Sequence, residues 1–221
     1  MRRHIGVILL KSEKCINKNT EMPMENRKSV LIVVAGPNGS GKTSVTSKIL
    51  QHKWLEDSVY INPDIVAQER FGDWNSKEAI MQAVKYCEDW REKCLSEQKS
   101  LIFETVLSAD DKVDYIERAI DAGFFVRLFF VCTTSPTINA ARIANRVMKG
   151  GHDVPITKII SRYQKSLSRC KYLARKVHRT YLYDNSIENA DAQLLVRFAD
   201  GKIIKHYVEN MPEWASEICN E

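Results

Sequence analysis

The sequence lacks the patterns that mark several common classes of protein. Its six cysteines include no C-x-x-C pair, so neither a zinc ribbon nor a thioredoxin-type redox motif is expected. We expect reduced thiols in a cytoplasmic protein. No segment approaches the roughly 18 consecutive apolar residues that a membrane-spanning helix needs, and we expect no membrane association. Internal repeats, low-complexity tracts and the N-K-x-D signature of guanine-binding switches are also missing.

What the chain does contain is ordinary for one folded domain. Of its 221 residues, 44% are hydrophobic and 28% are charged, which is enough apolar material for a core that needs no disulfide or metal. Residues 1–28 differ, because a short apolar run at 5–10 leads into a polar stretch that contains Met22 and Met24. That run is too short for a secretion signal and is followed by no cleavage site. We expect 1–28 to be a disordered leader, unless Met1 is an upstream start codon and translation begins at Met22 or Met24. A folded role for this segment is the alternative, and 29–221 would form a single domain.

One motif has a specific chemical meaning. An apolar run at 30–35 leads into a complete match to the phosphate-binding pattern G-x-x-x-x-G-K-[ST], and a helix-like segment follows, which is the context that the motif requires. The matching residues are Gly36, Pro37, Asn38, Gly39, Ser40, Gly41, Lys42 and Thr43. Backbone N–H groups of the loop and the helix N-terminus would hold phosphate oxygens. Lys42 would reach the β- and γ-phosphates of ATP, Thr43 would bind Mg²⁺, and Ser44 is assigned to the same nucleotide site.

Strands and helices alternate after this loop. Strand-like apolar runs occur at 59–61, 101–103 and 124–132, and helical spacing of apolar residues occurs at 75–98, 111–122, 135–148 and after Pro155. This alternation predicts an α/β fold, a P-loop NTPase with a parallel sheet and helices on both faces. Residues 194–208 read as a C-terminal β-hairpin, and 213–218 as a short closing helix. No apolar strand ending in Asp, the usual second motif of such folds, is apparent.

Two carboxylates follow predicted strands, at the sheet edge where ligands of such folds bind. Asp64 could accept a hydroxyl proton in phosphoryl transfer. Alternatively, Asn62 and Pro63 simply begin a helix, and Asp64 interacts with its dipole. Glu104 ends a buried apolar strand, and an unpaired buried carboxylate is costly. It would therefore meet Mg²⁺, a substrate hydroxyl or a basic side chain, with a structural ion pair as the alternative.

Positive charge is concentrated in one segment. Residues 142–179 contain eleven Lys or Arg and a single acid, Asp153. Arg142, Arg146 and Arg162 lie near the glycine turn at 150–151 and could form a lid that neutralises charge on a triphosphate. The remaining basic residues would form an ordinary solvated face, or a face that attracts an anionic partner. Nucleic-acid binding is not expected, because only Tyr163 and Tyr172 interleave with these charges.

Taken together, these segments resemble the zeta-toxin family of P-loop kinases, in particular its short single-domain bacterial members. The resemblance covers about residues 30–186. It rests on the phosphate loop, Y-I-N-P-D at 60–64, F-E-T-V-L-S at 103–108, 142–155 with its G-G-H-D-V-P, R-Y and S-L within 162–167, and Y-D-N-S at 183–186. These motifs in this order are much more specific than the loop alone.

The resemblance implies a nucleotide kinase-like fold with a helical lid, so that 29–221 would be a single P-loop kinase domain. It implies MgATP-dependent phosphorylation of a sugar hydroxyl of UDP-N-acetylglucosamine, and an antitoxin protein as a partner. Asp64 would be the general base and Lys42 the phosphate clamp, while Arg146 and Arg162 would face the transferred phosphate. Glu104 and Thr105 would form part of the substrate site, together with Asn62 and Asp64.

Two rival interpretations remain at this point. In the first, the fold is the same but the acceptor is a nucleoside, an antibiotic hydroxyl or a polynucleotide end. In the second, the chain is an ATP-gated binding module whose basic helix docks on an acidic protein partner.

Overall fold

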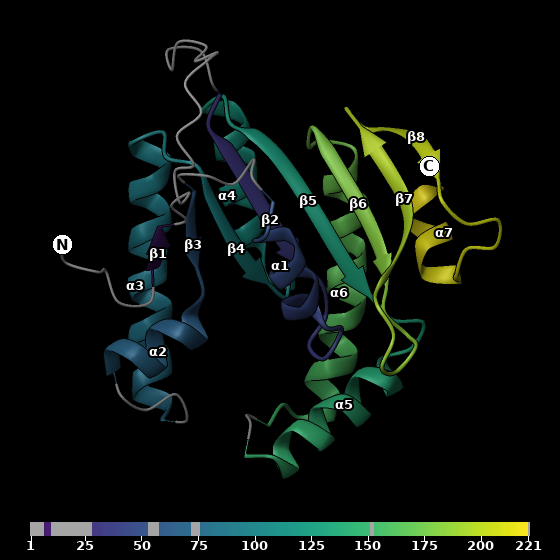
Figure 1. The fold of residues 1–221 in the computed structure, drawn as a ribbon, viewed down its shortest axis with the longest axis horizontal. Coiled ribbons are helices and arrows are strands. Elements are labelled where there is room, and N and C mark those ends of the chain that lie inside the picture. Colours follow the sequence, from purple (N-terminus) through teal and green to yellow (C-terminus); the bar gives the residue numbers. More distant parts are fainter. Residues whose placement is uncertain (1–6, 10–27, 53–57, 72–75, 151–152, 221) are drawn as a thin grey trace, which may run out of the picture.

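The computed structural model describes residues 7–9, 28–52, 58–71, 76–150 and 153–220 (Figure 1). The strands of this part of the chain form one eight-stranded sheet in the order β1-β3-β4-β2-β5-β6-β7-β8. The five strands β2, β3, β4, β5 and β6 run parallel, and β1, β7 and β8 run antiparallel to their neighbours. The strands are β1 (Val7–Leu9), β2 (Val30–Ala35), β3 (Val59–Ile61), β4 (Leu101–Thr105), β5 (Phe125–Cys132), β6 (Arg179–Asp184), β7 (Gln193–Ala199) and β8 (Lys202–His206).

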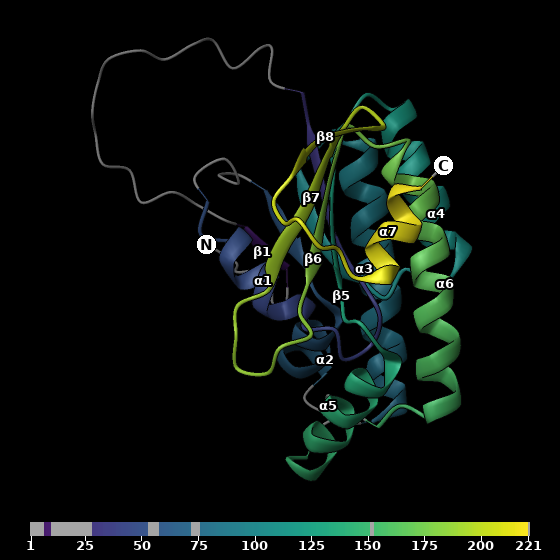
Figure 2. The ribbon, with the colours of Figure 1, turned by 90° about the vertical axis from the view of Figure 1, so that its right-hand side faces the viewer.

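Helices cover both faces of the sheet, as expected. They are α1 (Lys42–Ile49), α2 (Pro63–Phe71), α3 (Lys77–Ser96), α4 (Asp110–Asp121), α5 (Pro136–Met148), α6 (Ile156–Ala174) and α7 (Glu213–Cys219). Helices α3, α4, α6 and α7 pack on one face and α1 on the other (Figure 2). None of these helices is both long and apolar enough to cross a membrane.

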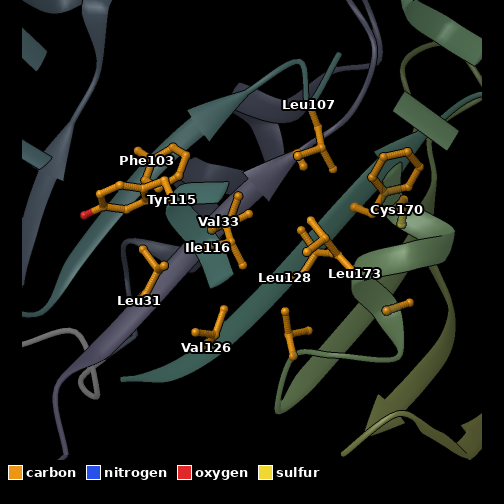
Figure 3. Packing of buried hydrophobic residues seen from close by; sticks show 14 of the residues in the cluster. Leu31, Val33, Phe103, Leu107, Tyr115, Ile116, Val126, Leu128, Cys170 and Leu173 are labelled. Carbon is orange, nitrogen blue, oxygen red and sulfur yellow. The ribbon is translucent and has the colours of Figure 1, made fainter. Parts of the chain in front are cut away.

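The central strand β2 shows how the sequence builds the two layers of core. Its side chains alternate in direction, as in any strand. Leu31 and Val33 enter the larger core cluster, where Leu31 lies near Val126 and Val33 near Ile116 (Figure 3). Ile32 and Val34 enter the smaller cluster beneath α1. Burial on both faces explains why this strand reads as a continuous apolar run.

Strand β6 was not predicted from the sequence. It pairs in parallel with β5 and antiparallel with β7, so it connects the parallel sheet to the C-terminal hairpin. Its segment, R-T-Y-L-Y-D, has no run of aliphatic residues, and only Thr180 and Leu182 are buried. The local pattern is therefore weak, and pairing with two neighbours makes it a strand. The hairpin itself forms as expected, with left-handed backbone at Asp200 (φ 47°) and Gly201 (φ 77°).

Part of the expected leader is ordered against the sheet. Val7–Leu9 forms β1, which pairs antiparallel with β3 at one edge. The disorder expected for 1–28 therefore does not hold for these three residues. Met22, Met24 and the rest of that segment up to residue 27 lie outside the described residues, as do Gly151 and His152 of the predicted lid turn.

Candidate active site

The phosphate-binding loop lies between the end of β2 and the start of α1. Its glycines have left-handed backbone, with φ of 77° at Gly39 and 88° at Gly41. A Cβ at Gly39 would lie 2.6 Å from the Asn139 carbonyl oxygen, and one at Gly41 would lie 2.1 Å from the Asn185 side-chain nitrogen. Both positions thus require glycine for conformation and for space. The loop is closely held by α5 and by the segment after β6, so its shape is preset.

Lys42 points its ammonium group back into this loop. The Nζ atom donates to the carbonyl oxygens of Gly36 and Pro37, both at 2.9 Å. Burial lowers the pKa of Lys42 from 10.5 to about 8, and nearby Arg146 adds to the effect, while the carboxylates of Glu104 and Asp64 oppose it. An anion placed beside this amine would favour its charged form. The ammonium of Lys42 is therefore held in a desolvated position, where a bound anion would stabilise its charge.

A chain of hydrogen bonds joins the loop to the start of α2. The hydroxyl of Thr43 donates to Glu104 Oε2 (3.3 Å), and the hydroxyl of Tyr60 donates to Glu104 Oε1 (3.0 Å). Asn62 Nδ2 donates to the Tyr60 oxygen at 2.9 Å. Burial, and then the Glu104 charge, raise the pKa of Tyr60, so it is a neutral donor at ordinary pH. Glu104 thus meets two hydroxyl groups, and its charge also acts on Lys42. Its role toward a metal ion or a substrate stays a prediction.

Asp64 combines the two properties that the sequence analysis gave as alternatives: it lies at a helix start, and its carboxylate is available for chemistry. The Asn62 side chain accepts a hydrogen bond from the Asp64 N–H (2.9 Å), and Pro63 is the first residue of α2, so the helix-start geometry is present. At the same time the Asp64 carboxylate is exposed and close enough to raise the pKa of Lys42. The cap therefore does not compete with a chemical role. It holds Asp64 in the first turn of α2, where its charge acts on Lys42.

The predicted lid arginines differ in their contacts. Arg162, on α6, donates to Asn38 Oδ1 at 3.3 Å, so it already reaches the phosphate loop. Arg146 is exposed near the end of α5, which projects beyond the ends of the parallel strands (Figure 1). Its charge still depresses the pKa of Lys42. Arg142 lies one turn earlier and lines a cavity beside the loop.

Thr105 makes structural contacts. Its hydroxyl accepts from the Leu107 N–H (3.0 Å), and its carbonyl oxygen accepts from the Gly36 N–H (3.2 Å). The first bond supports the left-handed conformation of Leu107 (φ 57°), a fully buried residue. The second ties the end of β4 to the first residue of the phosphate loop. Thr105 therefore fixes the shape of the loop from the neighbouring strand.

The cavity beside the loop was not foreseen from the sequence. Its volume is about 570 Å³, and it opens between α1 and the connection from β6 to β7. Besides Arg142, its lining includes Gly41, Ser44, Phe129, Tyr183 and Asn185. A surface ion pair between Lys48 and Asp191 (2.6 Å) joins its two sides. Ser44 and Arg142 were assigned to the nucleotide site from the sequence, but the cavity itself depends on β6, which has a weak local pattern.

The residues fit a triphosphate with Mg²⁺. The described residues contain no group of three or more His, Cys, Asp or Glu side chains that could hold a metal alone. Mg²⁺ in P-loop proteins instead takes one or two protein oxygens, phosphate oxygens and water. The Thr43 hydroxyl and the Glu104 carboxylate, 3.3 Å apart, supply such oxygens next to the loop. The glycine-built loop and the Lys42 ammonium would supply the phosphate contacts.

Comparisons with solved structures show the same fold. A chain in the crystal structure of the AvrRxo1-ORF1:-ORF2 complex with ATP superposes with a TM-score of 0.65 and 18% identity, over 87% of this chain and 64% of that one. This chain thus corresponds to less than two thirds of that protein's length. A structure of the PezAT toxin-antitoxin system of Streptococcus pneumoniae has a TM-score of 0.57 and 18% identity, over 88% and 78% of the two chains. These likenesses show a P-loop kinase fold. No curated protein matches the sequence.

The family profile described as "Zeta toxin" matches residues 13–193. The match includes the phosphate loop, Asp64, Glu104, the three predicted lid arginines and the segment from Asn185 to Gln193. Family and fold together support a kinase-type, ATP-dependent function. The chain belongs to the zeta toxin family.

Proposed function

We propose that this protein transfers the γ-phosphate of ATP to a hydroxyl group of a small molecule, with a nucleotide sugar such as UDP-N-acetylglucosamine as the acceptor. The observation that carries this proposal is the convergence of Lys42, Thr43, Glu104 and Asp64 at the ends of three adjacent parallel strands. Ligands of open α/β sheets bind at this edge. The resemblance of the motifs supports the nucleotide-sugar acceptor.

Each side chain has a distinct task in this proposal. Bound MgATP would supply the phosphoryl group and the charge of the metal. Lys42 and the loop N–H groups bind the phosphates, and Thr43 and Glu104 provide oxygens on the metal side. Asp64 takes the proton of the acceptor hydroxyl onto its carboxylate as that oxygen bonds to the γ-phosphorus, and the bond from this phosphorus to the bridging oxygen breaks to release ADP. Arg146 and Arg162 neutralise the charge on the oxygens of the transferred group.

The test is a transfer assay with an acceptor panel. Purified protein is incubated with MgATP and with UDP-N-acetylglucosamine, nucleosides, aminoglycosides and a polynucleotide with a free 5′-hydroxyl, and products are read by mass spectrometry. We expect one phosphate on the nucleotide sugar. Asp64→Asn should lower turnover by about 10²- to 10⁴-fold while ATP still binds. Asp121→Asn, on the last turn of α4, is the matched control.

Three results would change the proposal. Phosphate on a different acceptor would replace the nucleotide sugar and keep the kinase. Full turnover by Asp64→Asn would remove Asp64 as the base. ATP binding with no product from any acceptor would favour the ATP-gated binding module.

A protein partner is a second proposal. One of the two similar structures is of an ORF1:ORF2 complex, and the other is of a toxin-antitoxin system. We infer that an antitoxin encoded beside this chain binds it and blocks the kinase. Co-expression with the neighbouring reading frame, followed by gel filtration and the transfer assay, should give a complex with no activity. Separate elution with full activity would reject this partner.

A further inference from the structure

Asn185 links two parts of the molecule that are far apart in sequence. It directly follows β6, and its backbone N–H donates to the carbonyl oxygen of Cys132 at the end of β5 (2.8 Å). Its side-chain Nδ2 donates to the carbonyl oxygen of Ser40 in the phosphate loop, also at 2.8 Å. The contact is so close that a Cβ on Gly41 would lie 2.1 Å from that nitrogen. The glycine and the asparagine amide thus occupy complementary space.

The bond to Ser40 determines which way one peptide group faces. A trans peptide is planar, and its C=O and N–H point in opposite directions. Because Asn185 holds the Ser40 carbonyl on its own side, the N–H of Gly41 points to the other side of the loop. Backbone N–H groups of such a loop bind phosphate oxygens only when they converge on one point. Gly41, with φ of 88°, is the last residue before α1.

Asn185 stands on a rigid support. Asp184 Oδ1 accepts from the Ser186 hydroxyl (2.8 Å) and from the Trp214 indole N–H on α7 (3.3 Å). The Ser186 oxygen in turn accepts from the backbone N–H of Thr134 (2.8 Å). These bonds fix the segment on both sides of Asn185, so its amide has little freedom to leave the loop. Asn185 also lines the 570 Å³ cavity beside the loop.

We propose that Asn185 is a positioning residue for phosphate binding: it holds the Ser40–Gly41 peptide so that the Gly41 N–H faces the bound triphosphate. The inference rests on the proposed nucleotide binding. It goes further, because it assigns a role to a residue outside the phosphate-binding motif. Asn185 would influence phosphate binding through the fixed planarity of the Ser40–Gly41 peptide and not through a contact of its own with the ligand.

Two substitutions separate orientation from packing. Asn185→Ala removes the donor and the amide volume. Asn185→Asp keeps the shape but replaces the donor with an acceptor that faces the Ser40 carbonyl. Asn210→Ala, which removes an exposed amide between β8 and α7, is the matched control. Binding of sodium tripolyphosphate, ATP and adenosine is measured by isothermal titration, and folding is checked by the unfolding midpoint.

We expect Asn185→Ala to bind tripolyphosphate and ATP about tenfold more weakly, the worth of one well-placed hydrogen bond. Asn185→Asp should be weaker still, because its carboxylate repels both the carbonyl and the phosphates. Adenosine binding should not change, since adenosine has no phosphate. Equal losses for adenosine and tripolyphosphate, or wild-type affinity for tripolyphosphate in both variants, would overturn the inference. A wild-type protein that binds neither ATP nor tripolyphosphate would overturn the proposed function and this inference together.

Discussion

Lys42→Met is expected to make the ligand-free protein more stable while abolishing stabilisation by ATP. The ammonium of Lys42 is held among backbone carbonyls, and burial lowers its pKa from 10.5 to about 8. The folded protein therefore binds this proton less tightly than the unfolded chain does. At pH 7 both states are protonated, and folding carries the full cost of confining the charge. Methionine has a similar length and no charge, so it avoids this cost.

The expected gain in stability of Lys42→Met follows from the lowered pKa of Lys42. The fall from 10.5 to about 8 is about 2.5 pKa units, which corresponds to about 3.4 kcal/mol at 1.36 kcal/mol per unit. The Lys42 side chain is only partly buried, so solvent screening reduces this to about half. Methionine also cannot donate to the carbonyl oxygens of Gly36 and Pro37, and this loss subtracts about 1 kcal/mol from the gain in stability. A gain of about 1 kcal/mol in the free energy of unfolding remains.

The pH dependence of this stability gain tests whether the lowered pKa of Lys42 is its cause. The cost is fully present below pH 8, declines as pH rises toward 10.5, and is gone above it, because the unfolded chain then loses the proton as well. Urea unfolding of both proteins at pH 7 and pH 10 should show the advantage of Lys42→Met shrinking by about 1 kcal/mol. Lys48→Met is the control, since Lys48 lies on the same helix with 56% of its side chain exposed. An advantage that is absent at pH 7, or equal at both pH values, would refute the reasoning.

Three further substitutions test other parts of the structure by urea unfolding at pH 7. Tyr60→Phe leaves Glu104 Oε1 without its buried donor, so it should cost about 1–3 kcal/mol; a cost near zero would mean that water replaces the hydroxyl. Leu107→Ala should cost about 2–5 kcal/mol, because the side chain is fully buried, and a smaller cost would indicate that the site collapses around it. Arg118→Ala removes two bonds to Glu92 but should cost less than about 1 kcal/mol, since both side chains are exposed; a larger loss would indicate a cooperative ion-pair network.

The elements with strong local signals were predicted correctly. The apolar run of β2, the glycine loop and α1 follow from residues that are adjacent in sequence, because strand burial and loop conformation depend on local pattern. The same holds for the hairpin around Asp200 and Gly201. The position of Asp64 in the first turn of α2 also followed from Asn62 and Pro63, since capping and proline geometry act over two or three residues.

The arrangement of the site needed contacts that no local pattern contains. Glu104 meets Thr43 and Tyr60 because β4 lies between β2 and β3, and the order of strands is not determined by any one of them. The roles of Asp64, Arg146 and Arg162 in transfer stay predictions.

By itself the sequence determined the fold class, the phosphate loop and the family, because each depends on short motifs with strict conformational needs. Tertiary structure alone decided that β6 joins the sheet and that β1 covers an edge, since both are weakly patterned and gain their hydrogen bonds from neighbours. It also decided that Asn185 reaches Ser40 across 145 residues. Such a bond depends on where two separate strands end, and that is a property of the assembled sheet.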